Sequence, residues 1–412
     1  MKMRFELIKV LRKTSSKIAL FVMCGVLVLS CYLTTDVYWV NEHGTSEYGH
    51  AAAMKLRSAQ KAWAGPLDEE KLSQVLTELQ RIAATPEARS KDVTQNDIAY
   101  GWGQGIGGIR NLMNFSFASD FSSYDYDRAE SIRADQLSNF YSNRIRLLKN
   151  WLNDKTGPAY ERFSVAEKAF LIQQYESMET PLYYDYMRGW TQLSYNSSML
   201  IALCAIVLGY IVSGIFADEF RWHTDALLFT TARGRNSAVR DKLKAGLLLV
   251  TVAYWTCITI YTAFTLAFFG ADGANCYVQA DFSGWKCFYN ITNLQRYGLI
   301  ILLGYVGNLF FALLTMWISA KTKSAVFAVT VPFVLIFMPS IVENLDSSLI
   351  GKILSLMPER LLRIGQVMSY FDLLEIGGKV IGAIPAIAVL YAVLTILLIP
   401  ICYRQFSKTQ VI

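Results

Sequence analysis

The sequence predicts an all-α polytopic membrane protein with a mostly helical domain between its first and second spans. Of the 412 residues, 53% are hydrophobic and only 17% are charged, whereas soluble domains average about 25% charged residues. The charged residues are unevenly distributed, and several long stretches contain almost none. A disordered or fibrous chain is excluded by this apolar content, and an ordinary soluble domain does not fit the pattern.

Six apolar segments account for the predicted spans. A helix needs about 20 apolar residues to cross a bilayer, and none of the six has a lysine or arginine in its middle. Prolines in the last two are compatible with spans, because neighbouring helices can satisfy the carbonyls that a proline frees. The predicted spans cover residues 18–40, 196–216, 244–269, 297–319, 324–342 and 379–402.

Basic residues in the short loops predict the orientation. Residues 1–17, the loop 217–243, the link 320–323 and the tail 403–412 are richer in lysine and arginine than the loops on the other side. Basic loops stay on the cytoplasmic side, so both termini are expected there. The net charge of +6 then belongs to a face that anionic lipids attract, and it does not indicate nucleic-acid binding.

Residues 1–17 predict a short cytoplasmic amphipathic helix. Phe5, Ile8 and Leu11 recur at helical spacing among basic residues, which favours a helix lying on the inner leaflet. The alternative is the charged start of a signal peptide, with a loose lipoprotein cleavage box ending at Cys31. The apolar stretch continues beyond Cys31, which favours an uncleaved first span.

Residues 41–195 predict an extracytoplasmic, mostly helical domain. Asp68 precedes a leucine and valine stripe at helical spacing, and Ser164 with Glu167 forms a capping box before another helix. The glycine-rich run 101–110 lacks the Lys-Ser or Lys-Thr of a phosphate loop, so a turn or close packing is expected. The aromatic segment 181–190 predicts either an interfacial belt or a wall of a substrate exit path.

Cysteines and histidines provide few candidate sites. Cys276 and Cys287 share the outer loop 270–296, so they are either a loop-closing disulfide or two free thiols. The three histidines fit no metal-binding motif, and no metal site is expected. The chain has neither a catalytic constellation nor a Walker loop, so a transport subunit rather than an enzyme is expected.

The loop 217–243 combines basic residues with large apolar side chains. A fully solvated loop does not need Trp222, Leu227 or Phe229. The spans hold almost no ionisable residues, whereas ion-coupled transporters usually place carboxylates at mid-membrane. The loop is therefore either an interfacial helix on lipid headgroups or the docking helix for an ATPase partner.

At this point the chain resembles the membrane permease subunits of type-2 ATP-binding-cassette (ABC) transporters, specifically the Gram-positive bacterial type with a large first outer loop. The layout matches in its amphipathic start, its six spans, its loop between spans two and three, and an outer helical hairpin, here 343–378. Where the family often has Gly-Thr, this chain has His223-Thr224. The motifs that carry the resemblance are 215–220 (IFADEF), 225–228 (DALL), Gly234-Arg235, Lys242, 65–71 (GPLDEEK), 181–186 (PLYYDY) and Gly189-Trp190.

The resemblance implies a permease in a bacterial cell membrane. It would pair with a second permease chain, as a homodimer or heterodimer, and bind a separate ATPase that carries ATP and Mg, with no cofactor of its own. The ATPase-coupling residues it implies are Asp218, Glu219, Phe220, Asp225, Leu227, Leu228, Arg233, Gly234, Arg235 and Lys242.

The cargo implied is a peptide, an antibiotic or a lipid-like amphipathic molecule that is exported. A different class also fits a large outer domain: a membrane sensor or assembly scaffold whose outer domain binds a ligand. Polar and aromatic residues of the spans either line a cargo path or pack between helices. These residues are Tyr210, Tyr254, Trp255, Tyr261, Asn308 and Trp317.

Overall fold

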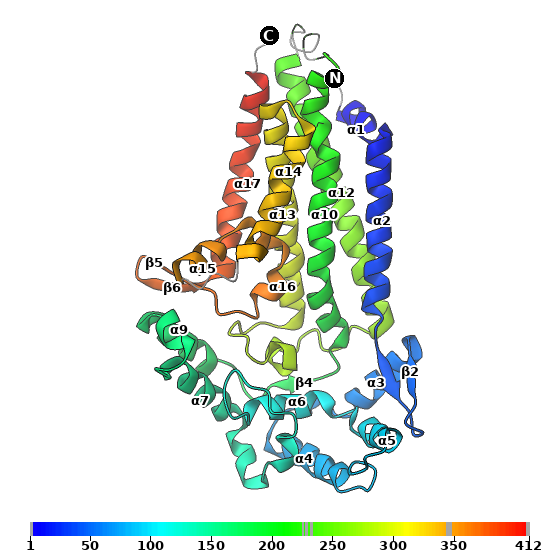
Figure 1. Ribbon diagram of the computed structural model, residues 1–412, viewed down its shortest axis with the longest axis vertical. Helices are drawn as coiled ribbons and strands as arrows, with labels where there is room; N and C mark the ends of the chain where they lie inside the picture. The colour runs from blue at the N-terminus through cyan, green and yellow to red at the C-terminus, as the bar shows by residue number, and fades with distance from the viewer. Residues whose placement is uncertain (1–2, 225, 227–229, 231–233, 343–347, 409–412) are drawn as a thin grey trace.

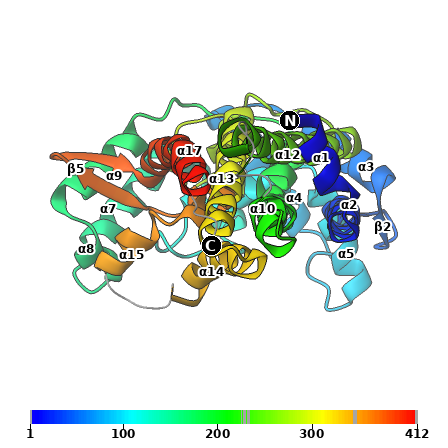
Figure 2. The ribbon, with the colours of Figure 1, turned by 90° about the horizontal axis from the view of Figure 1, so that it is seen from above.

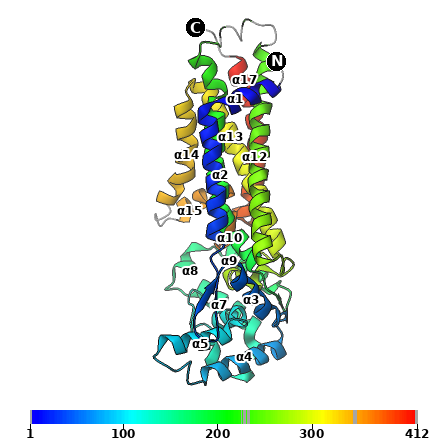
Figure 3. The same cartoon turned by 90° about the vertical axis from the view of Figure 1, so that its right-hand side faces the viewer.

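The computed structural model consists of a helical bundle stacked on a smaller, mostly helical domain (Figure 1). It describes residues 3–224, 226, 230, 234–342 and 348–408. Helix α1 (Met3–Arg12) and the last turn of the final helix lie at the same end of the bundle, far from the smaller domain. We call this the termini end, and Figure 3 shows the stacking from the side.

Five helices are long and apolar enough to cross a membrane, which confirms the prediction of a polytopic, mostly helical membrane protein. Residues 325–342 of the further predicted span, 324–342, form the apolar helix α14 (Ala325–Val342), which is not among these five, so the sixth span stays a prediction. The five candidate spans are α2 (Thr14–Thr34), α10 (Arg188–Arg221), α12 (Val239–Phe269), α13 (Asn293–Thr322) and α17 (Ala383–Ser407).

Two predicted span boundaries are wrong for the same reason. Residues 38–40 form strand β1 (Tyr38–Val40), which pairs with β2 (Ser46–Tyr48) in a hairpin instead of extending α2. Residues 379–382 form β6 (Lys379–Gly382), which pairs with β5 (Leu373–Ile376) instead of beginning α17. A short apolar run does not by itself distinguish a strand from a helix end.

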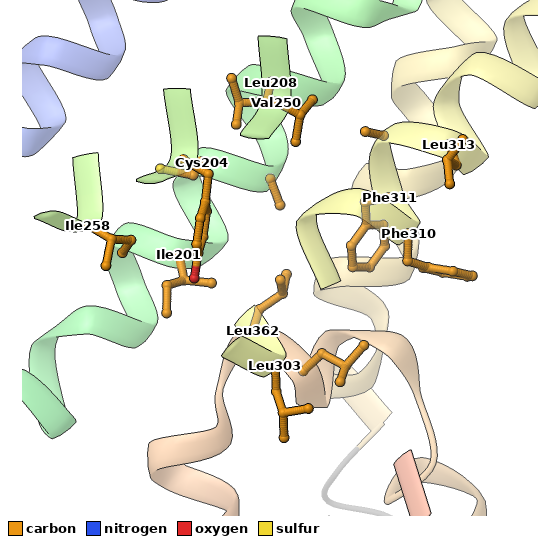
Figure 4. Close-up of a cluster of buried hydrophobic side chains, with 14 of the residues drawn as sticks. Ile201, Cys204, Leu208, Val250, Ile258, Leu303, Phe310, Phe311, Leu313 and Leu362 are labelled. Carbon is orange, nitrogen blue, oxygen red and sulfur yellow. The ribbon is translucent and has the colours of Figure 1, made fainter. Parts of the chain in front are cut away.

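Helices α10 and α13 form the centre of the bundle. In the most apolar 18-residue stretch of each helix, 67% of the residues are buried in α10 and 61% in α13. The corresponding shares are 17% in α2 and 22% in α17. Figure 2 shows α10 and α13 between α17 and α2. The close-up in Figure 4 shows the apolar core that α10, α12, α13 and η6 (Pro358–Leu362) build. Its labelled side chains are Ile201, Cys204, Leu208, Val250, Ile258, Leu303, Phe310, Phe311, Leu313 and Leu362.

The peripheral helices expose large apolar side chains. Phe21 on α2 is 79% exposed, and Val326 on α14 and Val389 on α17 are similarly accessible. A soluble protein does not leave whole apolar helix faces in water, because the cost grows with the exposed apolar area. These faces fit contact with lipid.

The smaller domain, which we call the large loop domain, extends from residue 38 to residue 187. It ends earlier than the predicted boundary at 195, because α10 begins at Arg188. Its elements after β1 and β2 are α3 (His50–Lys61), β3 (Gly65–Pro66), α4 (Glu69–Ala83), α5 (Val93–Gly103), α6 (Gly107–Ser116), η1 (Ala129–Ser131), η2 (Ala134–Asn139), α7 (Phe140–Asn153), α8 (Pro158–Arg162), α9 (Val165–Glu176) and β4 (Tyr183–Tyr184).

Local sequence signals explain where these helices begin. Asp68 caps α4 by accepting from the Lys71 amide at 2.8 Å, and Ser164 with Glu167 forms the predicted capping box of α9. The glycine-rich run forms the turn between α5 and α6. At Gly108 a Cβ would lie 2.3 Å from the Tyr184 hydroxyl, so this glycine permits close packing, as predicted.

Buried Arg144 fastens the large loop domain to the loop after α12. It lies on α7 and donates to the Trp285 carbonyl at 2.9 Å and the Cys287 carbonyl at 3.0 Å, while its guanidinium stacks on Tyr175. Within the loop are the short turns η4 (Val278–Ala280) and η5 (Phe282–Gly284). The arginine therefore replaces water at two backbone carbonyls that the fold buries.

The disulfide considered between Cys276 and Cys287 is not formed; all seven cysteines lie in described segments and are free. Cys276 packs in the apolar cluster of the large loop domain, and Cys287 packs in that of the bundle. Gln279 donates to the carbonyls of Cys287 and Tyr289. Together with Arg144 it closes the loop by hydrogen bonds, while packing directs the two sulfur atoms into different clusters.

The predicted hairpin 343–378 is only partly helical in its described part. It consists of α15 (Ser348–Leu354), η6, α16 (Ile364–Val367) and strand β5. Gly377 and Gly378 both have positive φ, at 59° and 77°, as the two-residue turn of a β-hairpin requires. Residues 343–347 lie outside the described residues.

Candidate functional site

Six charged side chains at the termini end form two neighbouring ion-paired groups, one of four residues and one of two, and together we call them the ion network. It joins α1, the start of α2, the end of α10 and the start of α12. Three cations and three anions take part: Lys9, Lys13, Lys242, Glu6, Asp218 and Glu219. Since the charges balance, the helices can meet here without leaving a net charge out of water.

Lys242 is the centre of the ion network. Its side chain is fully buried and donates to Glu219 at 2.6 Å and to Glu6 at 2.8 Å. Lys9 also pairs with Glu219, and Lys13 pairs with Asp218. Glu6 is 3% exposed although it lies on a helix whose Phe5, Ile8 and Leu11 are exposed. The polar contacts of α1 therefore face the bundle, and its apolar side is open.

Gly214 makes the approach of Lys13 to Asp218 possible. A Cβ there would lie 2.6 Å from the Asp218 Oδ2 atom and 3.1 Å from the Lys13 Nζ atom. Any larger residue would displace one partner of this ion pair. The glycine is thus required by the close approach of two side chains.

The turn that follows α10 is set by His223 and Thr224. His223 has a φ of +53°, a left-handed conformation that glycine adopts most easily. The Thr224 amide donates to the Glu219 carbonyl at 2.9 Å, and its hydroxyl donates to the Glu219 carboxylate. The turn is therefore attached to the same carboxylate that binds Lys242.

The structure brings three of the predicted ATPase-coupling residues into the ion network: Asp218, Glu219 and Lys242. Phe220 instead packs against Phe406 of α17 and lies partly buried. The backbone at Gly234 and Arg235 is part of the π-helical turn η3 (Gly234–Ala238). Asp225, Leu227, Leu228 and Arg233 lie outside the described residues.

Sequence reasoning missed Glu6 and did not assign Lys9 and Lys13 to a site. One signal was available: Glu6 is the only acidic residue among the first 17. A single carboxylate within a basic amphipathic helix suggests a specific partner, but sequence spacing does not identify that partner. Lys242 lies 236 positions away.

The residues considered for a cargo path are distributed among the helix contacts. Tyr254 donates to the Ile301 carbonyl, the Tyr261 and Thr34 hydroxyls are 2.8 Å apart, and Asn308 donates to two carbonyls of α10 and α13. These three are buried. Trp255 packs on Tyr254 and Tyr305, Trp317 stacks under Lys321, and Tyr210 is 45% exposed.

A cavity of about 1150 Å³ lies where the large loop domain meets the bundle, and we call it the junction cavity. None of the six residues above lines it. Its walls come from α4, α5 and α6, from the first two turns of α10, and from the segment around α16. Segment 181–190, considered as a wall of an exit path, contributes Tyr184, Asp185, Met187 and Arg188 to its lining.

The predicted glycine-rich run also borders the junction cavity, through Gly103, Gly107 and Gly108. At Gly107 a Cβ would have no neighbour within 4 Å, so the helix presents bare backbone to open space there. Burial by the surrounding chain raises the pKa of Tyr184 well above its ordinary value. Its hydroxyl is therefore neutral across the physiological range.

A scan against known protein families finds no family that matches this chain, and a search of curated proteins finds no match either. The functional argument consequently rests on the residue pattern and on the geometry of the ion network and the junction cavity.

Proposed function

We propose that this chain is the membrane permease subunit of an ABC transporter. A separate ATPase subunit docks on the loop 217–243, and two permease chains pair to export an amphipathic molecule. The termini end is cytoplasmic in this proposal, as the basic loops indicate. The observation that carries the proposal is the ion network, to which both described ends of that loop contribute.

The ion network is suited to transmit a push on the loop. Glu219 binds the turn through Thr224, binds α12 through Lys242 and binds α1 through Lys9. A displacement of the turn must therefore move three helices together, because breaking the buried pairs would leave charges unpaired at a cost of about 3–5 kcal/mol. When a docked partner changes shape, a connection of this kind can shift the bundle from one arrangement of its helices to another.

The turn also offers an exposed aromatic anchor. Trp222 is 67% exposed at the end of α10, and Trp is over-represented among the residues that dominate protein interfaces. The left-handed turn at His223 occupies the position at which the resembling permeases often have glycine, which supports a shared backbone path.

The test is an affinity purification from native membranes in mild detergent, with mass spectrometry of the proteins that co-purify. The proposal expects a soluble ATPase in near-stoichiometric amount. Because an anchor of this kind contributes about 2 kcal/mol or more, Trp222→Ala should reduce the co-purified ATPase about tenfold or more. Leu227→Asp in the same loop should abolish it.

The matched control is Tyr126→Ala, which removes an aromatic that is 73% exposed on the large loop domain. It should leave ATPase recovery unchanged. A wild-type purification without ATPase, containing a kinase or another membrane protein instead, would contradict the proposal and favour a sensor or an assembly scaffold.

A further inference from the structure

Two arginines that line the junction cavity have no carboxylate partner among the described residues. Arg188 donates to the Asp36 carbonyl at 3.1 Å, and Arg296 donates to the Gly365 carbonyl at 3.4 Å. Both line the cavity, and the Nε atom of each is buried without a hydrogen-bond partner in the described chain. Arg296 is only 8% exposed. A buried cation in this state is costly unless a ligand supplies an acceptor.

Arg296 and the partnerless Ser194 hydroxyl belong to one corner of the junction cavity. Gly365 joins them: its carbonyl accepts from Arg296, and a Cβ at Gly365 would lie 2.4 Å from the Ser194 carbonyl oxygen. Ser194 is 2% exposed, and its Oγ atom has no partner in the described chain. The corner therefore contains two buried donors at the level where α10 and α13 begin.

The carboxylates that line the junction cavity already have partners. Asp281 accepts from the Thr191 and Ser283 hydroxyls, and Asp185 accepts from the Tyr186 amide. At the far side, Arg110 pairs with Glu130 and with Asp127. Asp281 and Asp185 thus have donors for their carboxylate oxygens, although these donors are neutral. The charged groups of the lining that have buried donor atoms without an acceptor in the described chain are Arg188 and Arg296.

The large loop domain contributes apolar side chains to the lining beside polar ones such as Gln60 and Asn96. Leu79 and Ile82 of α4 and Leu56 of α3 reach it from the large loop domain, and each is mostly buried. A pocket with apolar walls and a few directed polar groups is the usual form of a small-molecule site. Its volume exceeds that of a typical drug-sized pocket, which is about 300–1,000 Å³, so a long molecule fits.

We propose that the junction cavity binds an acyl chain with an anionic head group. The head would accept hydrogen bonds from Arg296, Arg188 and Ser194 at the membrane-proximal end, and the chain would lie along Leu56, Leu79 and Ile82. An anionic acceptor forms charge-assisted hydrogen bonds, the strongest kind available to a buried guanidinium. This inference goes beyond the proposed function, because the site would bind such a ligand with or without an ATPase partner.

The test is photolabelling of the purified full-length chain in phosphatidylcholine nanodiscs. The probe is palmitate with a diazirine near the end of its acyl chain, and the neutral comparison is the matching palmityl alcohol. Digestion and mass spectrometry then give the label on residues 69–116 relative to the label on α17, whose exposed face reports general contact with lipid. Palmitate should label residues 69–116 about tenfold more strongly than the alcohol on this ratio, since a charged hydrogen bond typically changes affinity by that factor.

Two variants test the head-group contact and the space for the acyl chain separately. Arg296→Gln should lower the palmitate ratio about tenfold. Gly107→Trp should lower it similarly, because its side chain enters the cavity from a position where a Cβ meets nothing within 4 Å. Arg133→Gln on the exposed surface of the large loop domain, and Gly298→Trp at another open glycine outside the cavity, should leave it unchanged.

Several results would overturn the proposal. Equal labelling of residues 69–116 by both probes would show that the site does not recognise an anionic head group. Labelling that survives Gly107→Trp would place the ligand outside the cavity. If the Arg296→Gln variant cannot be reconstituted into nanodiscs, the labelling of the Gly107→Trp variant decides whether the ligand lies in the cavity. Inorganic phosphate in excess should not displace the probe; displacement would assign the arginines to a small free anion. ATPase docking plays no part in these measurements, so their failure leaves the proposed function untouched.

Discussion

The two ends of the bundle differ in the partners that they give to a buried cation. At the termini end, Lys242 is fully buried and contacts two carboxylates. At the junction cavity, Arg296 is nearly as buried, and the one hydrogen bond that its guanidinium makes within the described part of the chain goes to the Gly365 carbonyl. In the first arrangement the buried cation has carboxylate partners within the chain, whereas in the second the buried cation has none among the described residues.

This difference helps to distinguish buried charges that hold helices together from buried charges that belong to a binding site. A balanced, closed network stabilises one arrangement of helices, and removing any member should cost stability. An unbalanced cation beside a cavity contributes little to folding and is explained more simply by a ligand. Arg144 stands between the two cases, because it is buried yet bound to two carbonyls and stacked on Tyr175.

The largest effect is expected at the centre of the ion network. Lys242→Met leaves Glu6 and Glu219 buried without their shared cation, so the free energy of unfolding should fall by about 3–5 kcal/mol. Thermal unfolding of the purified protein in one detergent measures this. Lys244→Met, two residues along the same helix and exposed, is the control. Equal melting temperatures for the two variants would show that the ion network does not stabilise the fold.

A smaller loss is expected at Arg144. Arg144→Met removes the donors to the Trp285 and Cys287 carbonyls, and unsatisfied buried groups cost about 1–3 kcal/mol. Hydrogen exchange should increase in the loop that contains η4 and η5 while α2 stays protected. Arg146→Met changes an exposed arginine on the same helix and should not alter exchange. Unchanged exchange in Arg144→Met would show that the loop is held by apolar packing alone.

The smallest effect concerns a paired carboxylate on the large-loop-domain side. Burial alone would raise the pKa of Asp272, but hydrogen bonds from Arg57 and Lys61 outweigh it and hold the pKa below its ordinary value. Because the folded-state pKa is lowered, this contact stabilises above the unfolded-state pKa of about 3.9. The stabilisation is lost as the pH falls through the lower folded-state pKa.

Asp272→Asn should therefore destabilise the protein by about 1 kcal/mol at pH 7 and flatten the fall in melting temperature below pH 4. The control is Asp135→Asn, whose partner Arg133 is largely solvated. An acid profile identical to that of the unaltered protein would show that the pair contributes nothing to the junction.

Local patterns made much of the fold predictable. The five candidate spans follow from apolar length, and the starts of α4 and α9 follow from Asp68 and Ser164. Each of these depends on residues within a turn or two of one another. The ends of α2 and α17 were predicted less well, because hairpin pairing with distant residues decided them.

The candidate sites were less predictable. Glu219 and Lys242 were selected by resemblance, but Glu6, the second carboxylate that pairs with Lys242, was not. The disulfide considered in the loop 270–296 is absent among the described cysteines, since packing places the two thiols in separate clusters. Arg188 and Arg296 carried no distinguishing sequence signal, as nothing near them in the chain shows whether a carboxylate will approach.

The sequence by itself determined that this is a helical membrane protein, which helices are apolar enough to span, and where several of them begin. Those properties depend on composition and short-range spacing, which act before the chain is folded. Only the tertiary structure decided which charges are paired at Lys242 and which are left open at Arg296. Ion pairs and cavities form between residues hundreds of positions apart, and their energies depend on burial that exists only once the helices have packed.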